Sequence, residues 1–534
     1  QYDFAGRLAD VTFPSGNIAR SYSPSTGRVT TIGGPSGVLL SMTYDGSLMK
    51  SVAFSGAVSG TVAWTHDTDF RVINETINGA WPAAMTYDPD SLLTSADGLT
   101  LVRDPQSGRV TTATSGNVVE TRTYNEYGEL SAMATTVSGS PLLSFSYLRD
   151  DLGRITVKTE NGVVTAYGYD AAGRLTTVTE DGDLVESYAY DPNGNRISSL
   201  NSSGTFAATV DDQDRLETYG DLVFSYTLNG ELLNKTNTVT NESWDFEYDA
   251  VGNLREVLLP NGDVITYLVD GQGRRVGKLY NGVLERAWLW RGALQPVAEL
   301  DGAGNVVARF VYAEGVNVPE LMVTSTATYR LVKDHLGSVR QVVDVASGAV
   351  VQDIVYDAWG RVLLDTAPGW QPFGFAGGLY DADTGLVRFG ARDYDPEVGR
   401  WTAKDPIGFA GGPSFYAYAN NDPMSFADVD GENPVFVGLG WGLFLILTAT
   451  TVESHDDPDV LYIAAGEGAG LLAARALKVA LAARACPSVN RAPSGGTTFE
   501  ILDGVRRAKA AELAGNSTIR AEVVGSGGKV LTVP

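Results

Sequence analysis

Cysteine is almost absent from this sequence: Cys486 is the only one among 534 residues, and histidine occurs three times. A single thiol excludes a disulfide framework and a Cys-x-x-Cys metal site, so we expect a structural role for Cys486. No second histidine or cysteine stands at a local metal-ligand spacing from His335, which favours a packed, hydrogen-bonded histidine over a metal ligand. We therefore expect neither a metal nor another cofactor.

Long apolar runs are also scarce. Residues 435–452 (VFVGLGWGLFLILTATTV) form an uncharged stretch of 18 residues, the lower limit for a membrane-spanning helix. The flanks carry Glu432, Glu453 and Asp456 but no Lys or Arg anchor. We expect no stable membrane span here. An Ala-rich helix is expected to follow over 470–484.

Positive charge is in short supply, because 39 Lys and Arg face 64 Asp and Glu, a net charge of -25. This balance argues against a nucleic-acid-binding surface for the bulk of the chain. Residues 487–534 differ, since they carry six basic and four acidic residues. An acidic container with a separate cargo fits this distribution. No signal peptide is visible at Gln1, which lies inside a repeat, so we expect the chain to be a fragment of a longer one.

Glycine and tyrosine are abundant, with 61 and 24 residues. Much of this abundance comes from a repeated unit, Tyr-Asp-x-x-Gly-Arg-Leu, that recurs over residues 1–330. Tyr147, Tyr169 and Tyr190 open successive copies at spacings of 22 and 21 residues. Asp-x-x-Gly is a turn, because Asp bonds the backbone ahead of it and Gly accepts a positive φ.

The unit predicts a β-hairpin. Period-2 segments such as 163–169 and 175–179 flank each turn, as half-buried strands do. One hairpin cannot bury its apolar face alone, so neighbouring hairpins form a long twisted sheet, a curved β-solenoid or barrel. We expect each Tyr to stack on neighbouring repeats and each Asp to cap its turn.

Residues 334–431 separate the repeats from an Ala-rich, apolar tail. They include DHLGSVR (334–340), YDAWGR (356–361), RFGARDYDPEVGRWTAKDPIG (388–408) and the closing DVDG (428–431), which Glu432 follows. This stretch closely resembles the core of the Rhs/YD-repeat proteins, which include bacterial polymorphic toxins, the C components of Tc toxins and, more distantly, teneurins.

The resemblance implies a mainly β fold, in which the repeats coil into a hollow spiral cage and the core plugs one end. It also implies that the core cuts its own chain after the closing signature, leaving a variable C-terminal effector inside. Further implied partners are a cognate immunity protein and a secretion-system spike or adaptor. The implied location is secreted or on the cell surface, with delivery into a competing bacterium.

Aspartyl-type self-cleavage needs two carboxyl groups that share a proton, one acting on water and one on the carbonyl. In the resembling family, these residues are an Arg-Asp pair and an Asp twelve positions later, which Arg392, Asp393 and Asp405 match. Asp428 in the closing signature is a further candidate. Each also fits a purely structural turn or ion pair.

The closing signature departs from the family pattern Asp-Pro-x-Gly-Leu. Val429 replaces the proline and Glu432 the leucine. The register puts the cut between Glu432 and Asn433. Because a charged residue stands beside this bond, the sequence does not decide whether the bond is cut efficiently. A core that plugs the cage without cutting is the alternative.

The tail contains a strand, turn, helix and strand over residues 498–524, a small α/β unit. It resembles the phosphate-binding box of ParB/sulfiredoxin-like domains, in which helix-start amides and an arginine bind phosphate. The matching residues are Asp503, Gly504, Arg506 and Arg507, which imply nucleic acid or a nucleotide as ligand. An amphipathic helix with solvated arginines explains them equally well.

The sequence and the resemblance together predict four parts: a β-shell (1–330), a core that forms the plug and the self-cleavage region (331–432), an apolar or helical linker or translocation segment sequestered in the cage (433–486), and a C-terminal effector (487–534). The predicted function is encapsulation and delivery of a toxin. A teneurin-like or wall-associated adhesion protein without cleavage is the main alternative. A nuclease or nucleotide-binding enzyme that uses the repeats as a scaffold is the third.

Overall fold

The computed structural model describes residues 1–14, 16–412, 414–436, 522–524 and 530–532. The chain divides into two compact units, Gln1–Gly442 and Leu443–Pro534. In the second unit the structure describes one antiparallel hairpin, β42 (Glu522–Val524) with β43 (Val530–Thr532). β42 coincides with the end of the last strand predicted within residues 498–524. The helix predicted to start near Asp503 lies outside the described residues.

The first unit contains one antiparallel sheet of 35 strands, in which every strand pairs with the next along the chain. The first strands are β1 (Asp10–Phe13), β2 (Gly16–Tyr22), β3 (Val29–Gly33), β4 (Val38–Asp45), β5 (Leu48–Gly56), β6 (Gly60–His66), β7 (Val72–Ile77), β8 (Ala80–Tyr87), β9 (Leu93–Ala96), β10 (Leu99–Arg103), β11 (Val110–Ser115) and β12 (Val118–Tyr124). They are followed by β13 (Leu130–Val137), β14 (Ser140–Arg149), β15 (Ile155–Glu160), β16 (Val163–Tyr169), β17 (Leu175–Glu180), β18 (Asp183–Tyr190), β19 (Arg196–Asn201), β20 (Gly204–Val210), β21 (Leu216–Tyr219), β22 (Leu222–Tyr226), β23 (Leu232–Asn237) and β24 (Ser243–Tyr248). The last are β25 (Leu254–Leu258), β26 (Val264–Val269), β27 (Arg275–Tyr280), β28 (Val283–Arg291), β29 (Gln295–Asp301), β30 (Val306–Val311), β31 (Leu321–Val323), β32 (Thr328–Lys333), β33 (Val339–Asp344), β34 (Val350–Tyr356) and β35 (Val362–Asp365).

Alternate connections of this meander lie at opposite edges of the sheet. The edge after the even-numbered strands is what we call the Asp rim, because it carries the Asp-x-x-Gly turns 150–154, 170–174, 191–195, 249–253, 270–274 and 334–338. One further turn of this type, 301–305, follows β29 at the other edge. The opposite edge, the tight-turn rim, carries two-residue turns such as Asn161-Gly162 and Asn281-Gly282. Both residues of these turns have positive φ, as right-twisted hairpins require.

The repeat residues tie each hairpin to the preceding one. The Tyr169 hydroxyl donates to the Ile155 carbonyl at 2.6 Å, and the Arg154 guanidinium lies 4.7 Å from the centre of the Tyr169 ring. Asp170 accepts the backbone N–H groups of Ala172 and Arg174 through Oδ1. The predicted roles, Tyr stacking on a neighbouring repeat and Asp capping its turn, are confirmed.

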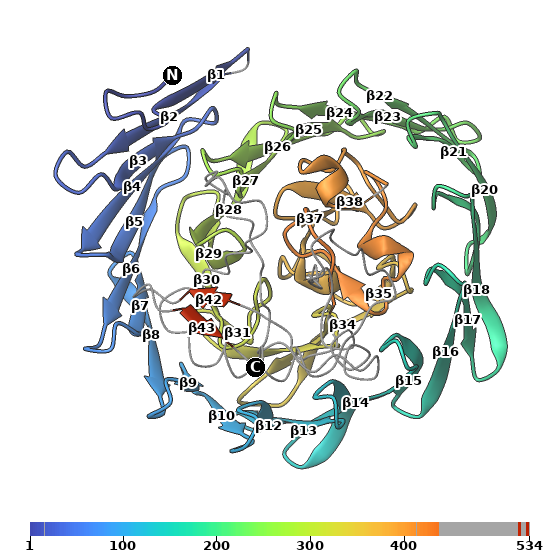
Figure 1. Ribbon diagram of the computed structural model, residues 1–534, viewed down its shortest axis with the longest axis horizontal. Helices are drawn as coiled ribbons and strands as arrows, with labels where there is room; N and C mark the ends of the chain where they lie inside the picture. The colour runs from blue at the N-terminus through green and yellow to red at the C-terminus, as the bar shows by residue number, and fades with distance from the viewer. Residues whose placement is uncertain (15, 413, 437–521, 525–529, 533–534) are drawn as a thin grey trace. The chain divides into compact units, whose positions relative to one another are not determined.

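The sheet coils so that strands about 200 residues apart lie face to face. Figure 1 shows β28–β31 inside the arc of β4–β8. Ion pairs join these successive turns of the spiral: Arg291 with Glu75 at 3.4 Å, the fully buried Arg330 with Glu120 at 3.0 Å, and Arg340 with Glu160 at 2.7 Å. The mainly β, spirally coiled fold implied by the resemblance is confirmed.

The chain then turns inward and forms the plug, which we define as residues 366–436. Its elements are η1 (Phe375–Gly377), β36 (Leu379–Tyr380), β37 (Val387–Phe389), β38 (Arg392–Asp395), β39 (Arg400–Trp401), η2 (Gly408–Ala410), η3 (Ala419–Asn421), β40 (Phe426–Ala427) and β41 (Val435–Phe436). An aromatic cluster forms its centre, in which the Tyr394 and Tyr418 rings lie 4.4 Å apart and Trp401 packs on both. The sheet runs on to β35, so the boundary predicted at residue 331 falls within β32.

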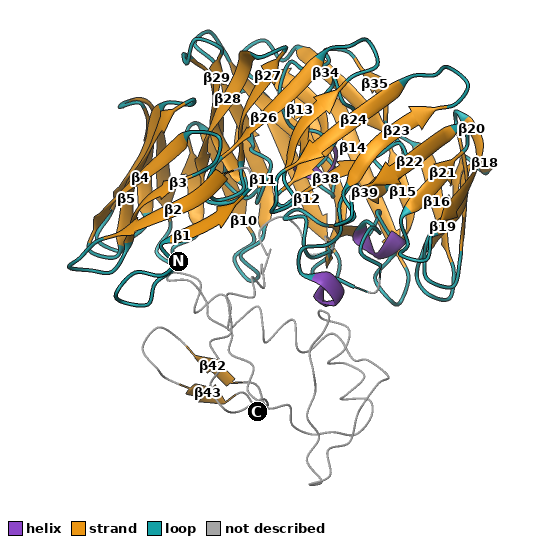
Figure 2. Cartoon of the chain, turned by 90° about the horizontal axis from the view of Figure 1, so that it is seen from above, coloured by secondary structure: helices purple, strands orange, loops and turns teal. Residues whose placement is uncertain are grey.

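The plug sits against the Asp rim. The Tyr416 hydroxyl donates to the Gly230 carbonyl at 2.7 Å, and the Asn421 amide donates to the Gly194 carbonyl at 2.9 Å. Figure 2 shows the short helices of the plug at one end of the sheet. His335 joins this contact from the 334–338 turn, since its Nε2 lies 2.8 Å from the Met424 carbonyl oxygen and its ring packs on Tyr147.

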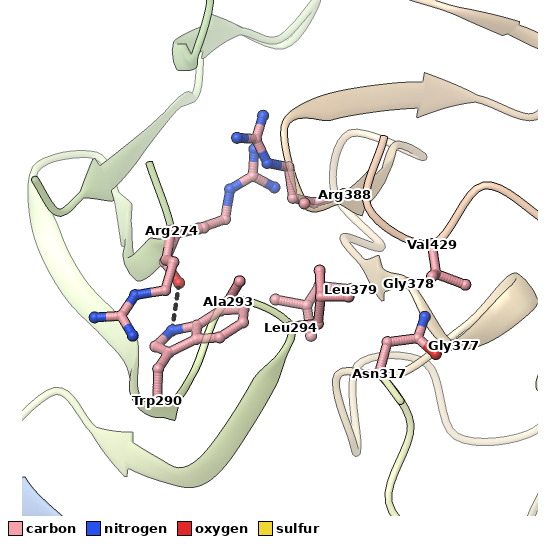
Figure 3. A pocket seen from close by; sticks show the side chains of 12 residues that line it. Arg274, Trp290, Ala293, Leu294, Asn317, Gly377, Gly378, Leu379, Arg388 and Val429 are labelled. Atoms are coloured by element: carbon pink, nitrogen blue, oxygen red, sulfur yellow. Dashed lines mark hydrogen bonds between the residues drawn. The ribbon is translucent and has the colours of Figure 1, made fainter. Parts of the chain in front are cut away.

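Ion pairs line the seam between sheet and plug. Lys235 pairs with Asp395 at 3.1 Å, and Lys278 pairs with Asp381 at 2.8 Å. Figure 3 shows a small cavity at this seam, bordered by Arg274 and Trp290 from the sheet and by Leu379, Arg388 and Val429 from the plug. The Trp290 indole N–H donates to the Arg275 carbonyl at 3.0 Å.

In the parts of the chain that the structure describes, no helix combines the length and apolarity needed to cross a bilayer. The apolar stretch 435–452 lies outside the described residues from position 437 onward.

Candidate functional site

Three of the predicted site residues converge at the end of the plug. Arg392 opens β38, and its Nη2 lies 2.8 Å from Asp405 Oδ2 and 3.1 Å from Asp428 Oδ2. The guanidinium also lies 4.1 Å from the centre of the Trp401 ring. All three charged side chains are buried, with 3%, 6% and 1% of their area exposed. A guanidinium that bridges two buried carboxyl groups fixes both.

Glycine allows the closing turn to approach β38 this closely. A β-carbon on Gly431 would collide with the Phe389 carbonyl oxygen, and one on Gly390 would collide with the Asp430 carbonyl oxygen. In the native arrangement, Arg392 Nε donates to the Gly431 carbonyl at 2.5 Å. The D-x-x-G signature therefore brings its own carboxyl groups and the residues after it next to Arg392.

The Glu432–Asn433 bond lies among these groups. A β-carbon on Gly411 would collide with Asp405 Oδ2 and lie 3.0 Å from the Glu432 carbonyl oxygen, so both oxygens face the same space beside Gly411. The Glu432 N–H donates to Asp428 Oδ1 at 3.0 Å. On the other side of the bond, the Asn433 N–H donates to Asp430 Oδ1 at 3.0 Å.

The electrostatics of the cluster favour the protonated forms of its carboxyl groups. Burial, followed by the neighbouring Asp430 and Asp405 carboxyl groups, raises the pKa of Asp428 to about 8, although Arg392 opposes the shift. Burial also raises the pKa of Asp405 above its ordinary value, again against Arg392. In the described part of this site, one guanidinium faces four acidic side chains, including Glu432, whose pKa burial likewise raises.

Asp393 does not join this cluster. Its carboxylate is fully buried between Arg275 at 2.8 Å and Arg388 at 2.9 Å, at the seam with the sheet. Successive side chains of a strand point to opposite faces, so Arg392 and Asp393 of β38 face different partners. The geometry thus gives Asp393 a structural ion pair in place of the expected position at the junction.

Asp430 belongs to the site, although the sequence analysis did not single it out. Its Oδ1 accepts both the Glu432 and the Asn433 N–H at 3.0 Å. The signal was present, because Asp before Gly commonly bonds the backbone two or three residues ahead. The tail residues Cys486, Asp503, Gly504, Arg506 and Arg507 lie outside the described residues.

Comparison with known proteins agrees with this architecture. Residues 1–424 match the teneurin YD-shell family. The chain belongs to that family. The YD-repeat resemblance drawn from the sequence is thereby confirmed.

Relatives of this YD shell include large proteins of different kinds. Human teneurin-4 is 26% identical over 460 residues, which cover 80% of this chain and 16% of teneurin-4. The tRNA nuclease WapA of Bacillus subtilis (strain 168) is 29% identical over 266 residues, covering 47% of this chain and 11% of WapA. The YD shell therefore spans less than a fifth of the length of these relatives.

Solved structures share the fold at low identity. The TcdB2-TccC3 crystal structure aligns with a TM-score of 0.59 at 16% identity, covering 80% of this chain and 28% of that one. A Photorhabdus luminescens Tc holotoxin pore aligns with a TM-score of 0.57 at 14% identity, covering 82% and 27%. The YD-shell fold is thus shared with Tc toxin components.

Proposed function

We propose that the plug of this YD shell hydrolyses its own backbone at the Glu432–Asn433 bond and that the shell holds the segment that follows. The observation that carries the proposal is the convergence at that bond. The Asp405 carboxyl group and the Glu432 carbonyl oxygen face the same space beside Gly411, and Arg392 bridges Asp405 to Asp428.

Each group has a role in aspartyl-type hydrolysis. Protonated Asp405 acts as the acid that polarises the Glu432 carbonyl, and its raised pKa supports that state. Asp428 takes a proton from the attacking water as it passes its own proton to the neighbouring Asp430 carboxylate. Arg392 keeps the two carboxyl groups in place and stabilises negative charge as the tetrahedral intermediate forms.

Cleavage would separate the cage from its cargo. The wider function that we propose is the encapsulation of a C-terminal effector and its delivery into competing bacteria by a secreted or surface-bound protein. A cognate immunity protein and a secretion-system spike or adaptor would be its partners. For the effector we propose phosphate or nucleic-acid binding through Asp503, Gly504, Arg506 and Arg507. The similarity of this chain to a tRNA nuclease supports nucleic acid as the class of ligand.

Adhesion without cleavage is the second candidate. The match to teneurin-4 favours it, because that match covers more of this chain than the match to WapA does. The two candidates differ in one observable, the integrity of the polypeptide.

The first prediction concerns the covalent state of the purified chain. Intact-mass and denaturing-gel analysis of the parent should give two fragments, 1–432 and 433–534. Asp405→Asn removes the acid beside the carbonyl but keeps the side-chain volume, so it should give one full-length species.

Asp383→Asn is the matched control, since Asp383 is an acidic plug residue that pairs with Lys278, remote from the junction. This variant should be cut like the parent. A single full-length species in both the parent and Asp405→Asn would overturn self-cleavage and favour the adhesion protein. A cut after Asn433, resolved by its mass, would contradict the assigned bond.

A further inference from the structure

Asp430 contacts the atom that must leave during hydrolysis. When the Glu432–Asn433 bond breaks, the Asn433 nitrogen departs as an amine and needs one additional proton. The described contact of that nitrogen is its N–H bond to Asp430 Oδ1 at 3.0 Å. Asp405 faces the same space as the carbonyl oxygen, on the other half of the same peptide bond.

Asp430 also shares a hydrogen bond with a second carboxyl group. The Asp428 and Asp430 side chains are close enough for their hydrogen bond to contribute, after burial, to the raised pKa of Asp428. Two carboxylates in contact cannot both be ionised at low cost, so such a pair retains one proton between them. Arg392 pairs with Asp428 on its other side.

We propose that Asp430 is a catalytic residue of the self-cleavage, the group that protonates the departing Asn433 nitrogen. This inference rests on the proposed function. It also makes Asp428 and Asp430 the pair that shares a proton, with Asp405 acting separately on the carbonyl.

The step balances with water as the second reactant. Water adds to the Glu432 carbonyl carbon, and its proton passes to Asp428, whose own proton moves along their shared hydrogen bond to Asp430. The proton on Asp430 passes to the Asn433 nitrogen as the C–N bond breaks. Glu432 then ends as a carboxyl group, Asn433 as an amine, and the pair again holds one proton.

Asp430 occupies the position that the family signature Asp-Pro-x-Gly-Leu leaves unspecified. Its turn holds the strand end in register, because its Oδ1 bonds both Glu432 and Asn433 N–H groups and its carbonyl oxygen accepts the Ala391 N–H at 2.8 Å. A test must therefore separate proton transfer from the structure of the turn.

The second prediction uses Asp430→Asn, which keeps an acceptor oxygen for both N–H groups but has no acidic proton. The full chain is synthesised in a cell-free system with a short radiolabel pulse, and the first-order rate of cutting is followed from pH 5.5 to 9. The expected rate is lower by about 10²-fold or more at pH 7, the usual contribution of a general acid. Asp430→Ser, whose hydroxyl also accepts backbone N–H groups, should behave alike.

The pH profile distinguishes the roles. In the parent the rate should fall above about pH 8, where the shared proton is lost, and both variants should lack this alkaline limb. Equal rates for the parent and Asp430→Asn would overturn the role of Asp430 while leaving self-cleavage intact. Uniform slowing with an unchanged pH profile would also overturn it, because only the structure of the turn would be affected. An uncut parent at every pH would refute the proposed function itself.

Discussion

At the scale of single residues, burial and pairing compete for the charge of each carboxyl group. At the junction Arg392 opposes burial but does not prevail, so the pKa of Asp428 rises to about 8. At Glu120 the outcome is reversed. Burial raises its pKa, but the opposing effect of Arg122 and Arg330 is larger and leaves the pKa at about 2, below its ordinary value. The number of cations within contact therefore decides whether a buried acid holds a proton or a charge.

The third prediction concerns Glu186, a buried acid of β18. Burial, followed by the nearby Asp357 carboxyl group, raises its pKa to about 7. Its folded-state pKa lies above the unfolded value of about 4.3, so its contribution to stability is present at low pH and is lost as pH rises to 7. Glu186→Gln cannot ionise, so its melting temperature relative to the parent should rise by a few degrees between pH 5 and pH 8. Scanning fluorimetry measures this difference.

The exposed Glu180→Gln serves as the control for this measurement, and its difference from the parent should not change with pH. A constant difference for Glu186→Gln as well would mean that Glu186 stays ionised in the folded protein.

At the scale of the hairpin, each Tyr-Asp-x-x-Gly-Arg unit supplies both its own turn and the link to its neighbour. Arg174 shows this double use, because its Nε donates to Asp170 Oδ2 at 2.7 Å while its guanidinium lies over the Tyr190 ring. The period of the repeat is therefore also the period of its stabilising contacts.

The fourth prediction tests that link. Tyr169→Phe keeps the ring against Arg154 but removes the hydroxyl that donates to the Ile155 carbonyl. The free energy of unfolding should fall by about 0.5–1.5 kcal/mol, as measured by urea denaturation. Hydrogen exchange should quicken around the 150–154 turn. Tyr2→Phe, at an exposed ring, should leave both unchanged, and an equally stable Tyr169→Phe would show that the stacking alone holds the repeats.

At the scale of the whole first unit, buried ion pairs lock one turn of the spiral against the next. Glu120 of β12 pairs with Arg122 on its own strand at 2.6 Å and with Arg330 of β32 at 3.0 Å. Arg122 also reaches Glu314 at 2.9 Å. These contacts join segments about 200 residues apart.

The fifth prediction is that Glu120→Gln loosens this lock. Removing one member of a buried network leaves the other charges uncompensated, which destabilises by about 3–5 kcal/mol. The urea midpoint should drop accordingly, and limited proteolysis should cut the unit faster. The exposed Glu126→Gln is the control, and equal midpoints for the two variants would contradict a stabilising role for the network.

The sequence predicts the local parts of this protein better than the distant contacts. The hairpins follow from Asp-x-x-Gly turns and period-2 strands, which are local signals. The ion pair between Glu120 of β12 and Arg330 of β32 depends on the coiling of the whole sheet, and no local pattern encodes it. At the junction, the family resemblance selected Arg392, Asp405 and Asp428, which the fold brings together. Strand alternation already implied that Asp393 faces away from Arg392, and the turn chemistry of D-x-x-G already implied the position of Asp430.

The position of the plug against the Asp rim limits how such a chain can change length. A deletion or insertion of one complete repeat removes or adds two strands, so every later strand keeps its direction and the plug still meets the Asp rim. A change of one strand would reverse the direction of all strands after it and deliver the plug to the tight-turn rim. Only even changes in strand number therefore keep the plug at the Asp rim, which makes the whole hairpin the unit of evolutionary insertion and loss.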